Sequence, residues 1–274
     1  MLVFNAMHKT LFLLLALVLG AGAPLWAYAV ERVAVGASFR HIYEQREDGS
    51  WHGLGVDVLR LLAERAGDTV RFRHYPWPRA IAMVERAQAD ILVGPYKSPE
   101  RQKNLSYTDQ AFYRDRVQFY GRRNNVVPWR GDLAALRDRR IATVRGWHYG
   151  DQFERARRLF DINEVPQLEN GLQMLARGRV DLLATNERNI SGLAGNLRLQ
   201  DSVTVLCPDI TQLDGYLAFP RDVRYSAVRD RYNALFSEMV RSGELARLGA
   251  RNGVLVPSAD GVSRSAAACT GPAR

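Results

Sequence analysis

Short apolar runs alternate with amphipathic stretches along most of the chain. The runs 32–37, 70–75 and 90–93 are typical of strands, and apolar residues at helical spacing predict helices over 53–66 and 79–88. Strands that alternate with helices of this length predict a mostly parallel sheet in an α/β fold.

A similar order of elements occurs again after residue 125. Segment 83–92 resembles segment 174–183, because in each a predicted helix leads through a turn and an aspartate, Asp90 or Asp181, into a short apolar strand. We predict that the two aspartates have matching structural roles. Two α/β lobes whose strand ends face each other would leave a ligand cleft between them.

The carboxyl-terminal part begins with a predicted strand over 215–219, followed by a long helical region over 227–248 that contains Gly243. Residues from 257 onward are rich in Ser, Ala, Gly and Pro and contain little that could be buried. We therefore predict a flexible tail over 254–274.

The amino-terminal residues have the pattern of a secretory signal peptide. Lys9 precedes the apolar run 11–19, and Ala27-Tyr28-Ala29 matches a small-x-small cleavage site. The run is shorter than the roughly 20 apolar residues of a membrane span. We predict a cleaved signal over 1–29 and a periplasmic location; the alternatives are an uncleaved anchor and a start at Met7.

Charge and cysteine content narrow the functional classes. The net charge of +9 is carried by basic residues dispersed among acidic ones, and together with export this disfavours a nucleic-acid partner. The two cysteines, Cys207 and Cys269, would lie in an oxidising compartment, but the sequence leaves open whether they pair. No metal-ligand cluster, phosphate loop or nucleotide motif is present, so we predict neither a metal nor a cofactor.

The segment 89–101 is the best candidate for a binding site. We expect Gly94-Pro95 to end the strand 90–93 and Ser98 to cap a new helix, whose amino end would attract an anion. Arg101 adds a fork of donors suited to a carboxylate, and we expect it to be partly exposed. The alternative is an ordinary strand–helix corner with a surface arginine.

Four short segments together carry a family resemblance. They are Gly53-Leu-Gly-Val-Asp57, Ser98-Pro-Glu-Arg101, Tyr107-Thr-Asp109 and Gly178-Arg-Val-Asp181. In their order and spacing, residues 30–253 resemble the bacterial extracellular solute-binding proteins of family 3. The resemblance implies the type II two-lobed α/β fold with two crossovers and lobes that close around a ligand. Residues 30–122 plus 215–253 would form lobe 1, and 126–211 lobe 2.

The resemblance also implies where the ligand binds. The carboxylate-clamping arginine of the family falls on Arg101, and its capping hydroxyl falls on Ser98. The predicted ligand-binding residues are Arg101, Ser98, Tyr96, Phe39, Trp77, Trp147, His148, Asn186 and Gly94. For Trp77, between two prolines, the alternative is a purely structural wedge, and for His148 a position at the rim.

Two departures from the family pattern bear on the ligand. Trp147 and His148 replace small hydroxyl residues after Gly146, and Asn186 stands where amino-acid binders carry an aspartate for the α-ammonium group. An amide cannot neutralise a buried ammonium as a carboxylate does. The predicted ligand is a small carboxylate-bearing solute, either an amino acid or a related organic acid, and an apolar or aromatic body suits the site better.

The leading functional prediction is a monomeric, non-catalytic binding protein that delivers its solute to an inner-membrane ABC importer. One alternative is a periplasmic lyase of the cyclohexadienyl dehydratase type, with His148, Glu187 or Asp214 as acid or base. The other is a ligand receptor for a membrane sensor.

Overall fold

The computed structural model describes residues 29–257 of the 274-residue chain. Within this range nine strands form one mixed sheet, and β2 and β3 form a separate small hairpin. The strands are β1 (Glu31–Gly36), β2 (Glu44–Gln45), β3 (Trp51–His52), β4 (Thr69–His74), β5 (Ile91–Tyr96), β6 (Leu105–Tyr107), β7 (Tyr113–Arg122), β8 (Arg140–Val144), β9 (Asp161–Val165), β10 (Leu182–Asn186) and β11 (Val203–Pro220).

The helices of the same range connect and cover these strands. The α-helices are α2 (Leu54–Ala66), α3 (Trp77–Glu85), α4 (Asp151–Ala156), α5 (Leu168–Ala176), α6 (Glu187–Asn196), α7 (Ser226–Arg241) and α8 (Glu244–Asn252). The short 3₁₀ helices are η1 (Arg101–Lys103), η2 (Leu133–Leu136), η3 (Arg157–Leu159) and η4 (Val223–Tyr225).

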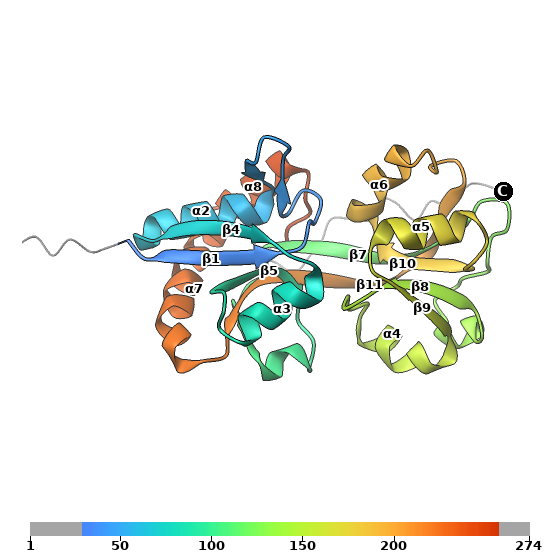
Figure 1. Ribbon diagram of the computed structural model, residues 1–274, viewed down its shortest axis with the longest axis horizontal. Helices are drawn as coiled ribbons and strands as arrows, with labels where there is room; N and C mark the ends of the chain where they lie inside the picture. Colours follow the sequence, from blue (N-terminus) through green and yellow to red (C-terminus); the bar gives the residue numbers. More distant parts are fainter. Residues whose placement is uncertain (1–28, 258–274) are drawn as a thin grey trace, which may run out of the picture. The chain divides into compact units, whose positions relative to one another are not determined.

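Two long antiparallel strands, β7 and β11, join two groups of parallel strands (Figure 1). The order in the sheet is β4-β1-β5-β11-β7-β10-β8-β9, with β6 also paired to β11. β1 is parallel to β4 and β5, and β8 is parallel to β9 and β10. The chain leaves the first group through β7 and returns to it through β11, so the second group is an insertion.

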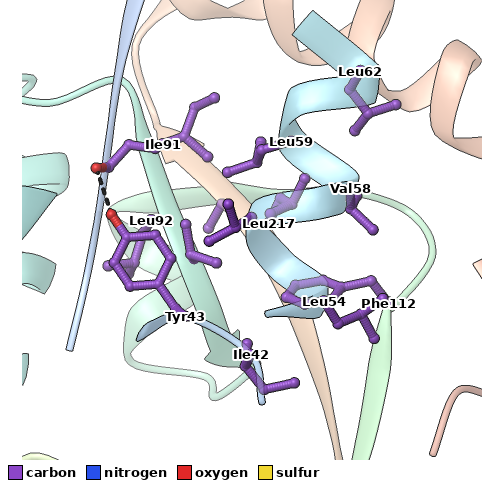
Figure 2. Packing of buried hydrophobic residues seen from close by; sticks show 14 of the residues in the cluster. Ile42, Tyr43, Leu54, Val58, Leu59, Leu62, Ile91, Leu92, Phe112 and Leu217 are labelled. Atoms are coloured by element: carbon purple, nitrogen blue, oxygen red, sulfur yellow. Dashed lines mark hydrogen bonds between the residues drawn. The ribbon is translucent and has the colours of Figure 1, made fainter. Parts of the chain in front are cut away.

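The hydrophobic cores follow the same division. One core draws its buried residues from 34–113 and from 217–254. Two further clusters draw theirs from 117–206. In the first core, one face of α2 packs against β5 and β11, as Figure 2 shows for Leu59, Leu92 and Leu217. This face comes from apolar residues at helical spacing, and α2 ends at Gly67, whose φ of 71° lies in the left-handed region.

The predicted equivalence of Asp90 and Asp181 is confirmed. The Asp90 carboxylate accepts the backbone N–H of Val33 on β1 at 2.7 Å, and the Asp181 carboxylate accepts that of Arg140 on β8 at 3.0 Å. Each aspartate thus holds the start of the neighbouring parallel strand. Arg140 also pairs with Asp181 through its side chain, and this hydrogen bond lowers the pKa of the Asp181 carboxyl below its usual value.

Several predicted boundaries are wrong. The predicted strand 215–219 is only the end of β11, which begins at Val203, and the predicted helix 79–88 is α3, two to three residues earlier. β5 continues through Gly94-Pro95 to Tyr96, because its neighbour β11 pairs with it as far as Tyr96. The element after Ser98 is not an α-helix but η1, a single 3₁₀ turn. The predicted helical region 227–248 is two helices, α7 and α8, separated at Gly243 with φ 71°.

Several predictions concern the chain ends and the cysteines. The predicted signal peptide over 1–29 lies almost wholly outside the described residues, as does most of the predicted tail 254–274, although Val254 at its start is buried in the first core. Cys207 is disulfide-bonded, and Cys269, the only other cysteine of the sequence, lies outside the described residues. Between residues 29 and 257, no helix is long and apolar enough to cross a membrane.

Candidate functional site

A small cavity lies at the carboxyl ends of β1, β5, β8 and β10, the edge at which α/β sheets bind ligands. Its water-accessible volume is about 20 Å³, room for about one water molecule. The lining residues come from both groups of strands: Phe39, Trp77, Gly94, Tyr96, Arg101, Tyr113, Trp147, His148, Asn186, Arg188 and Asn189.

The structure brings eight of the nine predicted site residues to this cavity. Ser98 is the exception. It is buried and its hydroxyl accepts the backbone N–H of Arg101 at 3.3 Å, so it caps the turn that carries the arginine. Ser98 therefore acts on the site through Arg101 rather than by lining the cavity.

Arg101 is more buried than expected. It is 9% exposed, not partly exposed, because its guanidinium reaches between the two groups of strands. One terminal nitrogen donates to the Tyr96 carbonyl at 3.0 Å and the other to the Gly146 carbonyl at 2.8 Å. Burial lowers the pKa of Arg101, yet an arginine stays protonated at neutral pH. Within the described chain Arg101 has no salt bridge to a carboxylate.

Three aromatic side chains form a wall beside Arg101. Phe39 meets Trp77 and Trp147 edge to face, with ring centroids 5.0 and 6.1 Å apart. The Arg101 guanidinium lies 5.8 Å from the Trp77 ring, within range of a cation–π contact. Trp77, at the first position of α3, belongs to the first hydrophobic core as well as to the cavity. Trp77 therefore has a structural role in the core and also lines the cavity, and its contact with a ligand stays a prediction.

A buried ion pair, absent from the predicted site, lies beside the cavity. Arg188, in the first turn of α6, donates to both carboxylate oxygens of Asp115 on β7 at 3.1 and 2.6 Å. Their side chains are 9% and 4% exposed. Burial alone would lower the pKa of Arg188, but the charge and hydrogen bonds of Asp115, together with the nearby Tyr113 and Tyr96, outweigh burial and raise the pKa. Arg188 also donates to the carbonyl of Arg40, which follows β1 in the first group of strands.

Asn186 and its neighbours form a polar network. The Asn186 amide oxygen accepts the backbone N–H of Asn189 at 2.9 Å and caps α6, while its amide nitrogen donates to the Tyr96 hydroxyl at 3.3 Å. The Tyr96 hydroxyl in turn donates to Asp115 at 2.5 Å. Burial raises the pKa of Tyr96 well above its usual range, so its hydroxyl keeps its proton.

His148 is the one proposed acid or base that lines the cavity. Its ring nitrogens lie 3.4 Å from Asp151 and 3.8 Å from Glu154. Burial lowers its pKa below 6.5, the Arg101 charge adds to this, and the two carboxylates oppose it. Glu187 is exposed, and Asp214 is paired with Arg114 at 2.6 Å, so neither reaches the cavity.

A wider groove opens on the other side of the aromatic wall. Its water-accessible volume is about 550 Å³. It shares Phe39, Trp77, Trp147 and Asn189 with the small cavity, so these side chains lie between the two spaces.

The sequence profile of the bacterial extracellular solute-binding proteins, family 3, matches residues 32–253. A probable histidine-binding protein of Neisseria gonorrhoeae is 24% identical over 187 residues, which are 66% of this chain and 68% of that protein.

Two solved structures show the same fold at low identity. A histidine kinase sensor domain similar to periplasmic binding proteins has a TM-score of 0.73 at 21% identity, covering 84% of this chain and 98% of that one. An ancestral arginine-binding protein bound to arginine has a TM-score of 0.69 at 15% identity, covering 81% and 97%. These likenesses confirm the predicted two-lobed α/β fold.

Proposed function

Since the chain belongs to the bacterial extracellular solute-binding proteins of family 3, we propose that it is a periplasmic receptor for a small carboxylate-bearing solute. The observation that carries this proposal is the buried guanidinium of Arg101, which has two carbonyl partners but no carboxylate among the described residues. A buried charge without a counter-charge is costly. A bound carboxylate would supply that charge beside the aromatic wall.

The capture step that we propose is closure of two lobes around the solute. Lobe 1 would comprise residues 30–122 and 215–253, and lobe 2 residues 126–211. The separate hydrophobic cores support this division, and the single pair of strands that joins them supports a hinge there. The Arg101 bond to Gly146 joins the two cores across the cavity, as a closed state requires.

We propose delivery of the solute to an ABC importer of the inner membrane as the primary role. The similarity to a probable histidine-binding protein supports a solute-binding role in general. The signal-like sequence of residues 1–29 supports export. The likeness to a histidine kinase sensor domain favours a second candidate, a receptor that reports its solute to a membrane sensor. Co-purification of the ligand-bound protein with a permease or with a sensor kinase would separate the two.

We favour a binding function over a lyase. Of the three residues considered as acid or base, only His148 lines the cavity. Proton transfer to and from a substrate needs groups within hydrogen-bond reach of it.

The decisive variant is Arg101→Ala in mature protein 30–274. Isothermal titration would use amino acids, 2-hydroxy acids, aromatic acids and dicarboxylates as probes. Removing one partner of a buried charge pair costs about 2–5 kcal/mol, so a bound probe should lose at least about 30-fold in affinity. Arg86→Ala, at an exposed arginine after α3, is the matched control and should bind like the wild type.

A far-UV circular dichroism spectrum should show that Arg101→Ala keeps the fold. If this folded variant bound the probe as tightly as the wild type, Arg101 would not be the anion clamp. If no probe bound the wild type, carboxylate capture itself would be wrong.

A further inference from the structure

Five oxygen atoms that could accept hydrogen bonds around the cavity already have a donor from the protein. The Gly94 carbonyl accepts the Tyr113 hydroxyl at 2.7 Å, and the Tyr96 and Gly146 carbonyls accept Arg101. The amide oxygens of Asn186 and Asn189 accept a backbone N–H and the Arg188 guanidinium. An incoming ammonium group, which brings three donors and no acceptor, would have to share each of these oxygen atoms with a donor of the protein.

The charges of the cavity point the same way. Its eleven lining residues include two arginines, Arg101 and Arg188, and no aspartate or glutamate. The nearest buried carboxylate, Asp115, lies behind this lining and is held by both Arg188 and the Tyr96 hydroxyl. With Asp115 counted, two buried guanidinium groups face one carboxylate. The excess is one positive charge, which a single carboxylate balances and a zwitterion does not.

From these contacts we infer that the cavity selects carboxylates without an amino group, and that Arg188 imposes this selection by occupying Asp115. The ligand class would be 2-hydroxy, 2-keto or unsubstituted carboxylic acids with an apolar or aromatic body. This inference rests on the proposed carboxylate-binding function and narrows it. The guanidinium of Arg188 thereby occupies the position from which a ligand's ammonium group could contact the Asp115 carboxylate.

The test uses matched pairs of probes that differ only at the amine. Phenylalanine would be compared with phenyllactate and 3-phenylpropionate, histidine with imidazole lactate, and glutamate with 2-hydroxyglutarate, each by isothermal titration. We expect the wild type to bind the amine-free member of at least one pair tenfold or more tightly than the amino acid. Equal or tighter binding of the amino acids would overturn the inference and leave carboxylate capture intact.

Arg188→Met tests the role of the arginine itself. It removes one lining cation and frees Asp115, so the preference for the amine-free acid should fall by at least tenfold or reverse. Arg188→Met with Asp115→Asn removes both charges and should not gain affinity for the amino acid. Arg177→Met, at an exposed arginine after α5, should leave the preference unchanged.

The outcomes separate the two levels of the proposal. If Arg188→Met folds and keeps the wild-type preference, Arg188 is not the selective residue and the inference is wrong. If Arg188→Met fails to fold, the wild type and the double variant still test the inference. The wild type must prefer the amine-free acid. The double variant must not bind the amino acid more tightly than the wild type does. If no carboxylate of any pair binds the wild type, both the inference and the proposed function are overturned.

Discussion

At the scale of single residues, the environment of a charge decides its role. Arg101 and Arg188 are both buried beside the cavity, yet Arg188 has a carboxylate partner, whereas the hydrogen-bond acceptors of the Arg101 side chain within residues 29–257 are carbonyls. A carbonyl satisfies an N–H but does not balance a charge. Of the two arginines, Arg101 is therefore the one that an anion would stabilise most.

His148 should report the arrival of that anion. Its folded-state pKa lies below 6.5, mainly because it is buried, so the ring is neutral at pH 7. The stability that the neutral ring contributes is present above pH 6.5 and is lost as the pH falls through the folded-state pKa. A bound carboxylate adds negative charge nearby and should raise this pKa, so affinity for the anion should increase as the pH falls.

An NMR titration of the histidine ring signals measures the pKa of His148 directly. The variant His148→Asn identifies which signal belongs to this residue. The midpoint should lie below 6.5 in the free protein and move upward when a bound probe saturates the site. An unchanged midpoint would place the bound carboxylate away from His148.

Sequence reasoning could find Arg101 but not Arg188. Arg101 lies in a segment with a strand, a capping hydroxyl and a fork of donors at fixed spacing. Arg188 follows Asn186 and Glu187, and its role depends on Asp115, which is 73 residues away in the chain. Such a long-range pair has no local pattern. Only the packing of α6 against β7 brings the two together.

At the scale of elements, Gly243 and Gly195 differ in backbone conformation, so the same substitution should change the stability of the protein differently at each. Gly243 separates α7 from α8 with φ 71°, whereas Gly195 lies within α6 and has open space where a side chain would begin. Gly243→Ala should lower the free energy of unfolding by about 1–2 kcal/mol, because a non-glycine residue is strained there. Gly195→Ala should raise it by about 0.4–1 kcal/mol, because alanine favours the helix.

Urea denaturation of the two variants beside the wild type would measure both changes. The same substitution is expected to act in opposite directions at the two positions. Changes of the same sign would contradict the backbone explanation.

Sequence periodicity predicted the elements better than their ends. The helix over 53–66 and the alternating strand 70–75 agree with α2 and β4 within a residue, because their apolar faces are buried. The end of β5 could not be predicted locally, since its extent depends on pairing with β11, more than 100 residues later. The single turn after Ser98 likewise depends on a long-range contact, because the Arg101 that it carries donates to the Gly146 carbonyl in the second group of strands.

At the scale of the whole molecule, a cavity with room for about one water molecule cannot admit an organic acid. We therefore expect the lobes to separate in solution without ligand. Opening would also let water reach the unpaired charge of Arg101.

Small-angle X-ray scattering should accordingly show a smaller radius of gyration when a bound probe saturates the protein. Arg101→Ala at the same probe concentration should show no such change. An unchanged profile for the saturated wild type would argue against closure on binding.

The two long strands also set the order in which the chain can gain its cores. The clusters between 117 and 206 come from one continuous stretch, whereas the first core needs residues from both 34–113 and 217–254. Contacts between distant segments carry a larger entropic cost of loop closure. A chain that emerges amino end first therefore cannot complete its first core until residues 117–206 have been made, because that core also needs residues 217–254. The stretch 117–206 can fold before the part that precedes it.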